Sequence, residues 1–207
     1  MKKIFLLSLS LSAASAFAGD WNEIPDAPDL VPGQITVGAG SLDRINGAIG
    51  NSTDADLYCI YVHDFTQFRA TTVGQPGSLS DTQLFLFNAN GLGVTFNDDS
   101  GGGARSTLTS TFLTYNGIYF IGVSGWDRDA TSVGGEIWAD TPFTTERAPD
   151  GPGAASPLSG WAGTGGTGTY SVLLNGASFH VVPEPGTMIA LAGGLGALLM
   201  RRRRNAK

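Results

Sequence analysis

The chain has 207 residues with a single cysteine, and its 18 acidic residues outnumber its 12 basic residues for a net charge of −6. One cysteine excludes an internal disulfide, and the length suits one domain once terminal segments are set aside. The acidic balance argues against nucleic acid or anionic lipid as a partner, since both require basic patches.

A secretory signal peptide is predicted at residues 1–18. Met1-Lys2-Lys3 supplies a charged start, and an apolar stretch follows from Ile4 to Ala14. Ala16 and Ala18 then place small residues at the two positions that a signal peptidase recognises. We expect a signal peptide helix that is cut after Ala18. The alternative, an N-terminal membrane anchor, would need a longer apolar stretch.

Residues 19–40 are expected to form an N-terminal extension, and residues 41–180 a β-sandwich or jelly-roll-like domain of the all-β class. Short strands separated by turn residues are typical of these folds. The Asn90-Gly91 pair predicts a hairpin, because both residues tolerate tight-turn geometry. The candidate strands are Gln34–Val37, Arg44–Gly50, Leu57–Val62, Phe68–Val73, Gln83–Phe87, Val94–Phe96, Ser106–Phe112, Gly117–Ser124 and Thr169–Leu174.

Four sequence blocks in the central part of the chain occur in order: Asp54-Ala55-Asp56-Leu57-Tyr58, the segment from Asp81 to Gly91, Asn97-Asp98-Asp99, and the segment from Gly117 to Val123. Together they resemble the bacterial pre-peptidase C-terminal (PPC) domain. The resemblance covers about residues 45–124, with 168–174 as a last strand. It implies a β-sandwich that serves as a non-catalytic accessory module on secreted enzymes. No peptidase accompanies the domain here, which puts a protease-linked role in doubt.

Some members of that family bind calcium, so the resemblance implies a candidate set of oxygen ligands. Calcium takes six to eight oxygens, mostly from carboxylates and carbonyls on turns. The spacing does not match an EF-hand loop, and the same acids could instead cap tight turns. The candidate calcium ligands are Asp54, Asp56, Asp81, Asn97, Asp98 and Asp99.

Residues 125–168 are expected to form a Gly- and Pro-rich excursion, with one short strand at Glu136–Ala139. Trp126, Trp138 and Trp161 lie in it. Exposed tryptophan rings can stack on sugars, which makes Trp126 and Trp161 candidate glycan-stacking residues. The alternative is that these rings pin the excursion onto the sandwich.

No catalytic residue is predicted. The sequence lacks the HExxH, CxxC and phosphate-loop motifs. Cys59 sits inside an apolar run, as an inert buried thiol would, and His63 is too close along the same strand to act as its base. We therefore expect a protein that is not an enzyme and that has no cofactor other than the candidate calcium ion.

A sorting signal is predicted at residues 181–207. Pro183-Glu184-Pro185 is followed by an uncharged stretch, 187–200, and by the four arginines Arg201, Arg202, Arg203 and Arg204. As a helix the stretch spans about 21 Å, short for a bilayer core of about 30 Å unless the bilayer thins locally. The basic cluster predicts that this end stays in the cytoplasm. The alternative is a buried helix with a solvated tail.

Together these three parts resemble the PEP-CTERM sorting signal of Gram-negative bacteria. The resemblance implies recognition by an exosortase, with cleavage near Pro183-Glu184-Pro185. It also implies a transient tether to the inner membrane, followed by location in the envelope or outside the cell. Such proteins are typical of bacteria that make exopolysaccharide.

The two processing steps would change the charge of the protein sharply. Residues 19–182 keep 5 basic and 17 acidic residues, which gives a net charge of −12. The predicted function is that of a secreted, non-catalytic cell-surface or extracellular-matrix protein associated with exopolysaccharide or another surface macromolecule. The alternatives are a secreted enzyme, a calcium-binding accessory module or a purely structural matrix protein.

Overall fold

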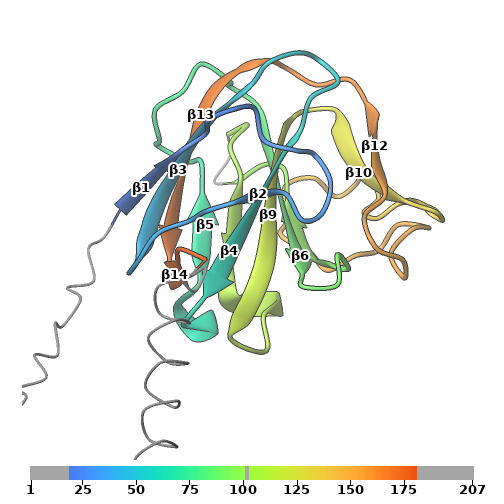
Figure 1. Cartoon of the computed structure of the whole chain (residues 1–207). Helices are drawn as coiled ribbons and strands as arrows, with labels where there is room; N and C mark the ends of the chain where they lie inside the picture. Colours follow the sequence, from blue (N-terminus) through green and yellow to red (C-terminus); the bar gives the residue numbers. More distant parts are fainter. Residues whose placement is uncertain (1–18, 101–102, 181–207) are drawn as a thin grey trace, which may run out of the picture.

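The computed structural model describes residues 19–100 and 103–180, and these form the predicted all-β sandwich (Figure 1). The signal peptide and the sorting signal lie outside the described residues. The first sheet contains five strands, in the spatial order β1 (Gly19–Asn22), β3 (Leu42–Ile49), β13 (Gly168–Asn175), β5 (Arg69–Thr71) and β8 (Thr107–Thr109).

The second sheet faces the first across the core. Its strands are ordered β14 (Ala177–Ser178), β4 (Asp56–Val62), β9 (Gly117–Gly125), β6 (Thr82–Asn88) and β7 (Gly93–Asn97), and β2 (Gln34–Ile35) also pairs with β4. The Asn90-Gly91 hairpin is confirmed: β6 and β7 pair antiparallel, and Gly91 adopts a φ of 76°. Each of the nine candidate strands overlaps an observed strand.

Two short 3-10 helices, Phe65–Gln67 and Ser110–Phe112, interrupt this pattern. The second one corrects the predicted strand Ser106–Phe112, which ends at Thr109. The Thr109 hydroxyl accepts a hydrogen bond from the Thr111 amide. Such a cap satisfies a free backbone amide at the start of a helical turn and favours the turn over further strand.

The main core lies between the two sheets because strand residues alternate in direction. On β4, Tyr58, Ile60 and Val62 point into this core, while Leu57 and Cys59 point to the other face of the sheet. The same alternation on β6 sends its leucines inward and its phenylalanines outward. These strands are thus buried on both faces, which explains their nearly continuous apolar sequences.

The excursion at 125–168 supplies the third layer that covers this outer face. The expectation of irregular structure there is wrong in part. Three strands, β10 (Arg128–Ser132), β11 (Gly135–Glu136) and β12 (Gly160–Gly163), form a small antiparallel sheet. The strand expected at Glu136–Ala139 is limited to Gly135–Glu136. Figure 1 shows this unit at one side of the sandwich.

A second core of aromatic rings joins this layer to the sandwich. The Trp138 ring lies 5.7 Å from Phe85, 5.6 Å from Phe87 and 5.7 Å from Phe96 between ring centroids. Gly93 makes room for it, since a Cβ at that position would lie 2.8 Å from the Trp138 ring. The excursion is therefore an integral part of the hydrophobic core.

Both ends of the described chain meet at one end of the sandwich. The extension at 19–40 contributes β1, which pairs parallel with β3, and β2, which pairs parallel with β4. The Gly19 amide donates to the Ser41 carbonyl at 3.1 Å, and Ser41 forms a bridge with Ser178. A Cβ on Gly19 would lie 3.0 Å from the Phe179 ring. The two termini of the folded body are thus adjacent.

Candidate functional site

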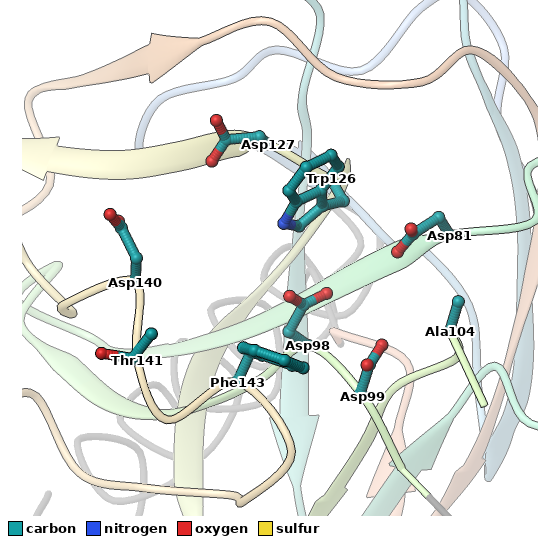
Figure 2. A pocket seen from close by; sticks show the side chains of 9 residues that line it. All are labelled: Asp81, Asp98, Asp99, Ala104, Trp126, Asp127, Asp140, Thr141 and Phe143. Carbon is teal, nitrogen blue, oxygen red and sulfur yellow. The ribbon is translucent and has the colours of Figure 1, made fainter. Parts of the chain in front are cut away.

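A cavity of about 420 Å³ opens where the second sheet meets the excursion. Carboxylates and two partly exposed aromatic rings dominate its wall, and Figure 2 shows them facing the same space. Its lining residues are Asp81, Asp98, Asp99, Ala104, Trp126, Asp127, Asp140, Thr141 and Phe143.

Strand ends and loop contacts hold these side chains in place. Asp81 directly precedes β6, Asp98 directly follows β7, and Trp126 follows β9. The Trp126 amide donates to the Asp81 carbonyl at 3.3 Å, which ties two of these ends together. The Asp99 amide donates to the Phe143 carbonyl at 3.0 Å, which brings the loop of Phe143 to the same edge.

Three of the carboxylates form a tight group. Asp81, Asp98 and Asp99 each offer a carboxylate oxygen within 4.8 Å of the other two. Asp98 is only 3% exposed, and its Oδ1 has no hydrogen-bond partner. The Oδ1 of Asp81 is likewise buried and unpartnered. Figure 2 shows the three carboxylates directed toward one another on the wall of the cavity.

Burial and repulsion between the neighbouring negative charges both disfavour ionisation of these three carboxyl groups. Burial, reinforced by Asp99, Asp81 and more distant acids, raises the pKa of Asp98 to about 7. Burial also raises the pKa of Asp81, with Asp99 adding to the effect. Within residues 19–100 and 103–180, the salt bridges are Arg44–Asp20 and Arg147–Asp150, so neither neutralises the group.

A second acidic group adjoins the first. Asp129, Glu136 and Asp140 also bring carboxylate oxygens within 4.8 Å of one another, and Asp140 lines the cavity. Burial raises the pKa of Asp129 to about 7, although a hydrogen bond from Gln83 opposes the rise. The cavity is therefore strongly electronegative on both sides.

A third acidic group lies elsewhere, between the two main sheets. Asp56 is fully buried, and its Oδ2 accepts a hydrogen bond from the Tyr170 hydroxyl at 2.6 Å. The Tyr170 hydroxyl lies 2.7 Å from that of Tyr58. Glu23, the neighbour of Asp56 in this group, accepts from the amides of Ala27 and Ala48. This group forms a structural hydrogen-bond network.

The six predicted calcium ligands therefore divide into two regions. Asp81, Asp98 and Asp99 come together at the cavity, whereas Asp56 belongs to the network between the sheets. Asp54 accepts from the Gly50 amide at 2.6 Å, as a turn cap does. Asn97 adjoins the cavity group, but its side chain bonds Ser100, the Thr107 amide and the Asp99 carbonyl. A single site built from all six residues is excluded.

The two predicted stacking residues also differ in their surroundings. Trp126 is 55% exposed and lines the cavity. Trp161 instead packs edge-on against Phe85 at 5.1 Å, and its Nε1 donates to the Asp29 carbonyl at 2.7 Å. Trp161 and Trp138 thus hold the excursion against the sandwich, which was the alternative interpretation of the sequence. Trp161 is therefore withdrawn as a stacking candidate.

Among the charged and aromatic residues of the cavity wall, Asp127, Asp140 and Phe143 were not predicted from the sequence. Phe143 is 45% exposed and lies opposite Trp126 in Figure 2. The only signal for them is that each lies in the excursion that carries Trp126. Their approach to Asp98 depends on how that segment folds back, which no local pattern specifies.

Cys59 is buried, and burial raises the pKa of its thiol to about 11. It therefore stays protonated and unreactive at neutral pH. His63 lies on the surface, where its Nδ1 is 2.7 Å from the Ser178 hydroxyl. The cavity wall has neither a cysteine nor a histidine, so its chemistry is that of carboxylate oxygens and aromatic rings.

Residues 181–204 match the family model of the PEP-CTERM protein-sorting motif. The protein is exported and sorted by an exosortase. The motif further indicates transient anchoring in the membrane before processing, then location in the envelope or outside the cell. The predicted membrane helix at 187–200 lies outside the described residues, which themselves contain no helix with the length and hydrophobicity to span a bilayer. The motif match covers the tail and not the sandwich, and no curated protein matches the chain.

Proposed function

We propose that the sandwich is a non-catalytic matrix module that binds exopolysaccharide at the cavity between the second sheet and the excursion. The observation that carries the proposal is the exposure of Trp126 and Phe143 on the wall of a carboxylate-lined cavity. Aromatic faces pack on the apolar C–H patches of sugars. Carboxylates accept hydrogen bonds from sugar hydroxyls, and such charge-assisted bonds are strong.

The negative charge of the protein favours one class of glycan over another. The net charge of −12 on residues 19–182 would repel a polyanionic glycan, so a neutral, hydroxyl-rich polymer fits the cavity best. The resemblance to PPC domains supports the same proposal, since modules of that kind accompany secreted proteins without catalysing a reaction. Export through the PEP-CTERM route supports the proposal, because an exported module can meet a polysaccharide outside the cell.

The test measures retention of the purified protein on immobilised exopolysaccharide from the producing bacterium. Trp126→Ala and Phe143→Ala are each expected to weaken retention about ten-fold, which corresponds to about 1.4 kcal/mol. Tyr61→Ala is the matched control, because Tyr61 is an exposed aromatic residue on β4 that does not line the cavity. Full retention by both cavity variants would refute the proposed site.

A secreted enzyme is the second candidate, and one observation favours it. Asp98 faces the cavity with a pKa raised to about 7, as a general acid requires. Incubation of the same polysaccharide with the protein separates the two functions. A binding module leaves the chain length of the polymer unchanged, whereas a hydrolase releases oligosaccharides. In the second case Asp98→Asn should abolish that release.

A further inference from the structure

We infer that Asp81, Asp98 and Asp99, which line the cavity, bind a divalent cation, most suitably calcium. The inference does not rest on the proposed glycan function, because it concerns the metal alone. It starts from the side chain of Asp98, which is 97% buried, lines the cavity and has an Oδ1 with no hydrogen-bond partner. A buried carboxylate oxygen without a partner is costly, and a cation in the cavity would remove that cost.

The turn-capping alternative does not account for this group. Elsewhere in the fold, acidic and amide side chains on turns accept hydrogen bonds from nearby backbone amides, as Asp54 does from Gly50 and Asp64 from Thr66. Among the described residues, no backbone amide donates to the carboxylates of Asp81, Asp98 or Asp99. The buried oxygens of Asp81 and Asp98 instead stay unpaired beside each other.

The geometry and the donor set favour calcium over softer metals. The three carboxylates converge within 4.8 Å, and each can supply one or two oxygens. The cavity leaves space for water to complete a shell of six to eight ligands, and calcium accepts such irregular shells better than magnesium does. Zinc and copper prefer nitrogen or sulfur ligands, and the cavity wall has no histidine or cysteine.

The inference is tested by calorimetric titration of calcium chloride into the exported protein, purified from producing cells and stripped with EDTA. We expect one saturable site with a Kd between about 10 µM and 1 mM, the range of extracellular calcium modules and weaker sensors. At a hundred-fold excess over Kd, the melting temperature should rise by about 5–10 °C. Magnesium chloride should bind at least ten-fold more weakly.

Substitutions at the proposed ligands and at control positions test where the calcium ion binds. Asp98→Asn and Asp81→Asn should each weaken calcium binding at least ten-fold, while Asp43→Asn, the same change on β3 away from the cavity, should leave it unchanged. Asp56→Asn should also leave it unchanged, because Asp56 belongs to the other acidic group. In EDTA, Asp98→Asn should melt no lower than the native protein, since it removes one of three mutually repelling charges. A loss of binding would then not reflect unfolding.

Terbium offers a second readout, because a nearby tryptophan sensitises its emission. Emission excited through tryptophan should appear on titration of terbium chloride and be displaced by calcium. Trp126→Phe should remove most of this emission and still bind calcium in the calorimeter. The inference is overturned if calcium gives neither heat nor a melting shift, or if Asp98→Asn and Asp81→Asn both bind calcium as tightly as the native protein.

Discussion

At the scale of single residues, Asp56 shows what burial does to a carboxyl group in this fold. It lies on β4 and is bonded to Tyr170 on β13, so the contact joins the two sheets. Burial raises the pKa of Asp56 from 3.8 to about 9, despite the hydrogen bond from Tyr170. The carboxyl group is therefore protonated in the folded protein at neutral pH.

This raised pKa predicts how the stability depends on pH. Between pH 4 and 9 the folded state holds a proton on Asp56 that the unfolded state has released. The unfolding free energy should therefore fall as the pH rises through that range, by at most about 1.4 kcal/mol per pH unit from this residue. Asp56→Asn should reduce the slope by that amount in urea unfolding at pH 5, 7 and 9.

Asp43→Asn serves as the control for this measurement and should keep the native slope. Equal slopes for the native protein and Asp56→Asn would show that Asp56 does not take up a proton on folding. Well below pH 4 the carboxyl group of Asp56 is protonated in both the folded and the unfolded state. The difference in unfolding free energy between the native protein and Asp56→Asn should therefore no longer change with pH in that range.

At the scale of elements, the excursion is stabilised by the aromatic rings that it places on the second sheet. Trp138 is 4% exposed and contacts three phenylalanines. Trp138→Ala should lower the unfolding free energy by about 3–5 kcal/mol, as truncation of a buried aromatic side chain does. Urea unfolding followed by circular dichroism measures the loss.

Trp126→Ala is the matched control, because the same residue type is here exposed at the cavity. Its unfolding free energy should stay within about 0.5 kcal/mol of the native value. If Trp138→Ala proved as mild as Trp126→Ala, the excursion would not be part of the cooperative core.

The strands that the sequence predicted share a particular property. The longer ones, such as β4, β6 and β9, have a buried face of their own and are bounded by turn residues. The strands β1 and β12 escaped prediction because Gly19–Asn22 and Gly160–Gly163 have little apolar pattern, and their conformation comes from the partners they pair with. The same limit applies to the cavity. Asp81 and Asp98 flank predicted strands, whereas Asp140 and Phe143 reach the site through tertiary contacts alone.

At the scale of the whole molecule, the export route predicts the two ends of the mature chain. Intact-mass spectrometry of the envelope and medium fractions should find a chain that begins at Gly19 and ends near Pro183–Pro185. Removal of both segments would leave the net charge at −12, since the chain loses all of its lysines and the four terminal arginines. A secreted chain that still carries Arg201–Arg204 would contradict processing by an exosortase.

The adjacency of Gly19 and Phe179 has a consequence for how the protein leaves the cell. A chain first held at its leading end and later at its trailing end is held, in both cases, by the same pole of the sandwich. The change from N-terminal to C-terminal attachment at the membrane therefore requires no rotation of the folded body. Figure 1 places β10 and β12 on the side away from that pole, so neither membrane attachment joins the chain at the layer that bounds the cavity.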